Sequence, residues 1–146
     1  MHELTGDLIG GELIVNDLSD PSTVYGVHGA DGRSAWKCLT RRTGLAGDWE
    51  AVEWAWLPPG GVSGEHLHTR TEEVYIILTG RAEILLNGTA TEVGPGDVIL
   101  TGVGTVHGLR NIGDSDVSWL VIEISSPRTA AVLRSEGARV LEGRES

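Results

Sequence analysis

The sequence predicts an all-β fold, in which short strands form a sandwich or barrel within a single domain. Apolar segments with strand-like patterns follow one another at close, regular spacing. Turn signals separate these segments, and the chain contains 21 Gly and 5 Pro. A length of 146 residues with 40% hydrophobic residues is enough to bury one core.

Residues 1–47 predict an N-terminal β-arm that belongs to the same domain. Asp20-Pro21-Ser22 signals a turn, and the Asp31-Gly32 pair is a strong hairpin signal. Three segments around these turns have strand character, at residues 13–15, 23–27 and 34–40. We expect the arm to pair within the domain or across a dimer.

The strand signal sharpens from residue 49 onward. Pro58-Pro59 ends the first segment, because proline lacks a backbone donor, and Asn87-Gly88 requires a tight type I′ turn. Residues 73–78 are apolar on both faces, as expected for a sheet buried in a sandwich. Seven strands are predicted, at 49–57, 73–78, 81–86, 89–93, 98–101, 106–110 and 117–125.

Residues 127–146 predict a short C-terminal helix and a tail. The helix-forming segment after Pro127 covers residues 129–136, and Gly137 follows as an end signal.

Charge and composition exclude several classes of partner. The net charge of −10 argues against binding nucleic acid or an anionic membrane surface, which both attract clustered Lys and Arg. The chain has no apolar run of about 18 residues and no signal-peptide pattern, so we expect a cytoplasmic protein without a membrane span. Cys38 is the only cysteine, so it cannot form an intramolecular disulfide, and we expect a small buried apolar side chain.

Three of the five histidines fall inside one stretch, from Gly60 to Asn111, together with the carboxylate of Glu73. His66 and His68 are two residues apart, so on a strand their imidazoles point to the same side. Glu73 and His107 would complete a set of three nitrogen ligands and one oxygen ligand, which suits a divalent transition metal. Octahedral coordination by four protein groups leaves two adjacent positions for water, substrate or dioxygen.

The residues alone leave two alternatives open. A single histidine is more often a hydrogen-bonded or surface residue than a metal ligand. Glu72 competes with Glu73 for the carboxylate role, and because neighbouring strand residues face opposite ways only one of them can join the site. Glu73 shares its face with Tyr75 and Ile77.

The stretch from Gly60 to Asn111 resembles the cupin superfamily in both of that family's motifs. The first motif is a glycine, His-x-His, a glutamate and a second glycine, here Gly60, His66, His68, Glu73 and Gly80. The second motif fits at Gly96, Gly104, His107 and Asn111, while Gly102 replaces the usual proline. This resemblance selects Glu73 over Glu72.

The resemblance implies a double-stranded β-helix, a jelly-roll-like barrel, over residues 48–126. It implies His66, His68, Glu73 and His107 as ligands of one divalent transition metal ion: iron, manganese, nickel, zinc or copper. Single-domain cupins commonly form homodimers through N-terminal strands, which gives residues 1–47 a role in a dimer interface.

We expect a metal-dependent cupin enzyme that acts on a small organic molecule, with dioxygenase chemistry favoured. Glu73 and Tyr75 are the candidate catalytic residues for moving protons. The alternatives are an isomerase, cyclase or lyase, for example one similar to polyketide cyclases, and a cupin that binds a small molecule without catalysis.

Several other residues are weaker candidates. His28 could reach the mouth of the barrel from an N-terminal hairpin, and Arg70 could meet an anionic substrate. Alternation places Arg110 opposite His107, and hence in solvent, and Asn111 is expected to hold a turn. The tryptophans that could form an aromatic wall are Trp36, Trp54, Trp56 and Trp119.

Overall fold

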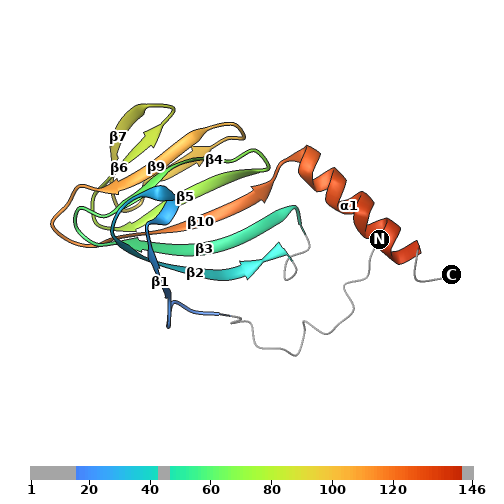
Figure 1. Cartoon of the computed structure of the whole chain (residues 1–146), viewed down its shortest axis with the longest axis horizontal. Helices are drawn as coiled ribbons and strands as arrows, with labels where there is room; N and C mark the ends of the chain where they lie inside the picture. The colour runs from blue at the N-terminus through green and yellow to red at the C-terminus, as the bar shows by residue number, and fades with distance from the viewer. Residues whose placement is uncertain (1–15, 43–46, 143–146) are drawn as a thin grey trace.

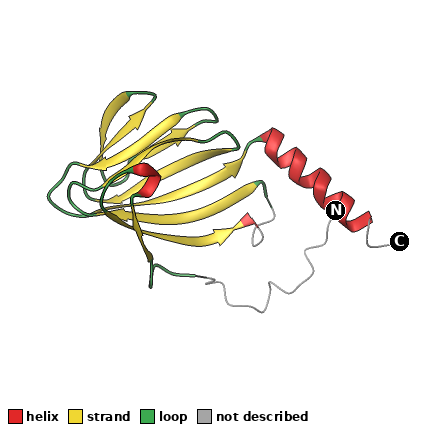
Figure 2. Cartoon of the chain, viewed as in Figure 1, coloured by secondary structure: helices red, strands yellow, loops and turns green. Residues whose placement is uncertain are grey.

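The computed structural model describes residues 16–42 and 47–142 of the chain, and it consists of two antiparallel sheets that face each other (Figures 1 and 2). The six-stranded sheet runs in the order β1 (Ser22–Tyr25), β2 (Arg33–Arg41), β3 (Trp49–Leu57), β10 (Val117–Ser125), β5 (Thr71–Thr79) and β8 (Val98–Thr101). The four-stranded sheet runs in the order β4 (Val62–Leu67), β9 (Val106–Asn111), β6 (Ala82–Leu86) and β7 (Thr89–Val93).

The predicted all-β class and the jelly-roll-like arrangement are confirmed. Each of the seven strands predicted from residue 49 onward is present, and β4 is an additional strand that carries His66. The chain passes between the two sheets, so strands that are neighbours in sequence often lie in opposite sheets. The predicted tight turn at Asn87-Gly88 also forms, with φ angles of 49° and 80°.

The N-terminal arm forms a hairpin, but its connection differs from the expected two-residue turn. β1 pairs with β2, and β2 pairs with β3, so the described part of the arm extends the six-stranded sheet. The connection contains a 3₁₀ turn, η2 (Val27–Gly29), because this segment packs against β4 and does not turn back at once. Residues 13–15 lie outside the described residues, and the dimer role of the arm stays a prediction.

The C-terminal helix α1 (Pro127–Glu142) is longer than the sequence predicted. It begins with a cap, since the Ser126 hydroxyl accepts a hydrogen bond from the Thr129 N–H at 3.2 Å, and Pro127 occupies the first helical position. The helix continues through Gly137, because one glycine costs only about 1 kcal/mol within a helix. Within the described residues, no helix is long and apolar enough to cross a membrane.

Strand register places the interior side chains of the six-stranded sheet in rows. Residues directly opposite each other in neighbouring strands share a face, and successive rows lie two residues apart. Glu123 pairs with Glu73 in one row, and Trp119 pairs with Ala55 two rows away. From the Trp119 row onward the interior is apolar core, which includes Leu57, Ile77, Ile84, Leu109 and Val117.

Candidate metal centre

The four predicted ligands come together in the barrel interior from both sheets. One donor atom of each of His66, His68, Glu73 and His107 lies within 4.8 Å of all the others. His66 and His107 are paired across β4 and β9, whereas Glu73 projects from β5 in the opposite sheet. His68 follows the end of β4, so only His66 of the pair lies on a strand, yet both imidazoles reach the cluster.

Hydrogen bonds orient two of the imidazoles. The Nδ1 atom of His66 lies 3.0 Å from the Gly64 carbonyl oxygen, which can only accept, so this Nδ1 carries the proton. The Nδ1 atom of His68 lies 2.9 Å from Thr71 Oγ1. Partners of this kind at one ring nitrogen direct the other nitrogen, Nε2, toward a metal.

Burial keeps these imidazoles neutral. It lowers the pKa of His66 to about 4, against the opposing effect of the hydrogen bond to Gly64. Burial also lowers the pKa of His68, although the nearby Glu73 carboxylate acts in the opposite direction. A neutral imidazole keeps the lone pair that a metal ion requires.

Glu73 is a buried carboxylate among imidazoles, with only 4% of its surface exposed. Its Oε2 atom lies 2.6 Å from His107 Nε2, and its Oε1 atom lies 3.4 Å from His68 Nε2. Burial favours the protonated carboxyl, but the hydrogen bond with His107 and the neighbouring imidazoles outweigh it, so the pKa of Glu73 is lowered.

The residues of this cluster fit a divalent transition metal. A buried anion needs a compensating positive charge, and within the described residues no Lys or Arg forms an ion pair with Glu73. Three imidazoles and one carboxylate are ligands that divalent iron, manganese, nickel, zinc and copper accept. A single bound ion would supply the positive charge that Glu73 lacks.

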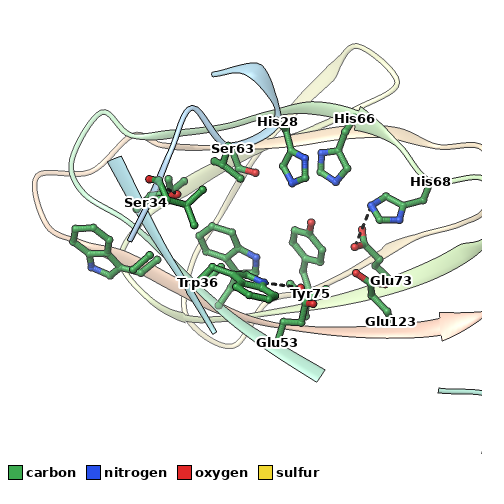
Figure 3. Close-up of a pocket in the computed structure, with 18 residues that line it drawn as sticks. His28, Ser34, Trp36, Glu53, Ser63, His66, His68, Glu73, Tyr75 and Glu123 are labelled. Carbon is green, nitrogen blue, oxygen red and sulfur yellow. Dashed lines mark hydrogen bonds and ion pairs between the residues drawn. The ribbon is translucent and has the colours of Figure 1, made fainter. Parts of the chain in front are cut away.

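A cavity of about 260 Å³ continues from this cluster into the barrel. Figure 3 shows His66, His68 and Glu73 toward one end of it, Tyr75 in the middle, and Trp36 and Ser34 toward the other end. Three of the four candidate tryptophans line it, namely Trp36, Trp56 and Trp119, while Trp54 does not.

The other candidate residues from the sequence lie in three different places: the cavity wall, the apolar core and the surface. Tyr75 is buried and lines the cavity, with its hydroxyl 3.3 Å from His107 Nε2, whereas Ile77 belongs to the apolar core. Glu72 is exposed, and Arg110 is an exposed residue that pairs with Glu83.

Asn111 has the structural role expected from the sequence. Its amide group donates to the carbonyl oxygens of Leu57 and Ser115, at 3.1 and 2.9 Å, and its side-chain oxygen accepts from Gly113. Cys38 is only partly buried, so the expectation of a buried cysteine is wrong.

Sequence reasoning missed two acidic residues of the cavity and underrated a histidine. Glu53 and Glu123 line it, and alternation along β3 and β10 was a signal that could have found them. Burial, reinforced by the Glu53 and Glu73 carboxylates, raises the pKa of Glu123 to about 7. The His28 ring stacks on His66, with ring centres 3.6 Å apart and planes 13° apart, so this residue does reach the site (Figure 3).

Comparisons with known proteins agree with this architecture. The family model of the cupin domain matches residues 54–123. A Thermotoga maritima protein named as an oxalate-binding protein is 37% identical over 68 residues, which cover 47% of this chain and 56% of that protein. The chain therefore spans little more than half the length of this relative.

Two solved structures extend the likeness to three dimensions. A predicted oxalate decarboxylase from Thermotoga maritima is 27% identical, with a TM-score of 0.73 over 77% of this chain and 99% of that one. A conserved barrel domain protein from Salinispora arenicola is 23% identical, with a TM-score of 0.59 over 70% of this chain and 84% of that one. The second likeness concerns the fold alone.

Proposed function

Because this chain is a member of the cupin superfamily, we propose that His66, His68, Glu73 and His107 bind one divalent transition metal ion and that the protein is a metal-dependent enzyme for a small organic acid. The proposal depends on one observation, the buried Glu73 carboxylate that three imidazoles surround. When bound, such an ion acts as a Lewis acid that polarises a carbonyl or carboxylate oxygen.

An organic acid with two adjacent oxygen donors is the substrate class that we propose. The relative that is 37% identical carries the name of an oxalate-binding protein, and oxalate has this arrangement of oxygens. The metal ion and the Glu73 carboxylate together would carry net positive charge, which attracts an anionic ligand into a chain whose overall charge is −10.

Oxygen-dependent cleavage of a carbon–carbon bond is our leading candidate for the reaction, in line with the dioxygenase chemistry that we expected from the sequence. The support is spatial, because the cavity continues beyond the ligand cluster and has room for a second small reactant beside an acid. Decarboxylation without net oxygen use is the second candidate, which the likeness to the predicted oxalate decarboxylase favours. Binding without catalysis is a third, in keeping with the name of the oxalate-binding relative.

Tyr75 is the residue that we propose to hold a proton at the cavity wall. Burial, and then the charge of Glu73, raises its pKa well above the usual value of 10, so the phenol keeps its proton at neutral pH. Its hydroxyl can therefore donate a hydrogen bond to a substrate oxygen beside His107. Glu73 remains a predicted catalytic residue, in addition to its proposed role as a ligand.

Metal analysis of purified protein tests the site. We expect about one equivalent of metal in the wild type and loss of that metal in His66→Ala and His107→Ala, with circular dichroism showing that both variants stay folded. Arg110→Ala is the matched control, because Arg110 lies on the same strand as His107 but is exposed. Full metal content in the two histidine variants would show that the ligand set is wrong.

The reaction is tested with metal-loaded protein and a panel of small organic acids. Oxygen uptake coupled to substrate loss would support the leading candidate, while release of carbon dioxide without net oxygen uptake would support decarboxylation. If calorimetry detects binding but neither gas changes with any acid that binds, the non-catalytic candidate replaces both.

A further inference from the structure

The side chains that line the cavity change from acidic to aromatic along the strands of the six-stranded sheet, with one row every two residues. At the metal end, the paired residues Glu73 and Glu123 face the interior. Two residues along, Tyr75 pairs with Val121, and Val121 pairs with Glu53. The cavity wall therefore passes from carboxylates to a mixed row, and the next row is aromatic.

That aromatic row contains a small residue between two large ones. Ala55 of β3 pairs with Trp36 of β2 on one side and with Trp119 of β10 on the other, and all three line the cavity. Side chains directly opposite in neighbouring strands lie about 5 Å apart, so the methyl group of Ala55 leaves a slot between two indoles. A flat apolar ring suits such a slot, because aromatic rings pack well by stacking.

The slot is held in shape by a hydrogen bond. The Trp36 indole N–H donates to Glu53 Oε2 at 2.8 Å, which fixes that ring against the wall (Figure 3). Trp119 is 4% exposed and belongs to the apolar core. A ligand ring would therefore meet surfaces that need little rearrangement.

The distance between the metal end of the cavity and its aromatic row sets the length of ligand that can contact both. Glu123 and Trp119 are four residues apart on β10, and strand geometry makes that about 13 Å. A two-carbon acid at the metal end would leave the aromatic row without contact. A second carboxylate on a longer acid would lie close to Glu53, whose like charge repels it.

We propose that the cavity binds an elongated monocarboxylic acid, with its carboxylate and an adjacent oxygen at the four-residue cluster and a flat apolar ring in the slot between Trp36 and Trp119. This inference rests on the proposed function for the acid end only. It narrows the substrate class from small organic acids in general to acids with an aromatic tail.

Isothermal titration calorimetry of metal-loaded protein in oxygen-free buffer tests the inference with three 2-oxo acids. Pyruvate supplies the acid end alone, phenylpyruvate adds a ring, and 2-oxoglutarate adds a second carboxylate. We expect phenylpyruvate to bind at least about tenfold more tightly than pyruvate, because the ring buries apolar surface. We expect 2-oxoglutarate to bind no more tightly than pyruvate.

A variant that fills the slot gives the matched comparison. Ala55→Leu is expected to lower phenylpyruvate affinity by at least about tenfold while pyruvate affinity and metal content stay unchanged. Ala90→Leu, the same substitution at an exposed position of β7, is expected to change neither affinity.

Equal affinity of the wild type for pyruvate and phenylpyruvate, with full metal content, would overturn the inference and leave the proposed function standing. Tighter binding of 2-oxoglutarate than of phenylpyruvate would overturn it as well. A protein that takes up no metal and binds none of the three acids would overturn the proposed function, and the inference with it.

Discussion

Single hydrogen bonds at Nδ1 decide which nitrogen of His66 and His68 faces the cluster. Thr71 has this role for His68, and it is a buried residue at the first position of β5, 7% exposed. The link matters because an imidazole that can rotate or change tautomer loses part of its affinity for a metal.

Thr71→Val is therefore expected to weaken metal binding by about tenfold while the fold is kept, since valine has nearly the same shape and no hydroxyl. Competition with a chelator of known affinity, followed by metal analysis, measures the change. Thr69→Val is the control, because Thr69 is exposed on the preceding loop. Equal affinity in wild type and Thr71→Val would show that Thr71 does not orient His68.

The protonation of Glu53 makes the stability of the protein depend on pH. Burial raises the pKa of Glu53, the hydrogen bond from Trp36 and the charge of Arg41 oppose this, and the charge of Glu73 adds to it. The charge of Glu53 in turn raises the pKa of Glu123, on the neighbouring strand. The native Glu53 carboxyl thus holds its proton to higher pH than the unfolded one.

We expect Glu53→Gln to gain stability relative to the wild type as pH rises. In the wild type, a raised native pKa means that the native state binds more protons than the unfolded state above the usual value of 4.5, so the free energy of unfolding falls through that window. Urea unfolding of metal-free protein near pH 4 and near pH 8 measures the difference.

Glu72→Gln, on the exposed face of β5, is the control for this comparison. The expectation for Glu53 fails if the stability difference between wild type and Glu53→Gln is the same at both pH values.

At the scale of elements, the contact between η2 and β4 places His28 over His66, one of the proposed metal ligands. Gly64 of β4 makes this contact possible, because a Cβ atom there would overlap the carbonyl oxygen of His28. The ring stacking of His28 on His66 follows from this close approach. The N-terminal arm therefore forms part of the wall of the site.

Gly64→Ala is expected to displace η2 and to destabilise the protein by about 1–3 kcal/mol, since overpacking costs that much. Thermal unfolding gives the stability, and the NMR shifts of the His28 ring report the displacement. Gly102→Ala is the matched control, because the nearest atom to a Cβ there is Thr105 Oγ1 at 3.9 Å. Unchanged His28 shifts in Gly64→Ala would show that the contact does not position the arm.

At the scale of the whole molecule, the proposed metal ligands come from both sheets. His66 and His107 belong to strands of the four-stranded sheet, and Glu73 belongs to the six-stranded sheet. A metal ion held by all of them would bind the folded barrel and not the unfolded chain, so binding adds to the free energy of unfolding.

Metal is expected to raise the unfolding temperature of the wild type, with a gain of about 2.7 kcal/mol when the free ion is at about 100 times its dissociation constant. Differential scanning calorimetry with metal and then with excess EDTA measures this gain. His66→Ala should show no such shift. A wild type that unfolds at the same temperature under both conditions would contradict a metal bridge between the sheets.

The sequence by itself determined most of the strands and the four candidate ligands, because strand patterns and motif spacing are local features. Strand segments follow from residue alternation and from turn residues such as Asn87 and Gly88, and the spacing of the two histidine motifs identified the four residues that the structure brings together. Parity along one strand also placed Arg110 in solvent.

Only the tertiary structure decided the rest, because it depends on register between strands that are distant in sequence. The burial of Glu73 and the exposure of Glu72 are one example, because alternation along β5 could not distinguish the two and only the resemblance to the cupin motif had favoured Glu73. The slot at Ala55 and the stacking of His28 on His66 likewise arise where separate segments meet. No single stretch of sequence contains those contacts, so their existence could be known only once the sheets were paired.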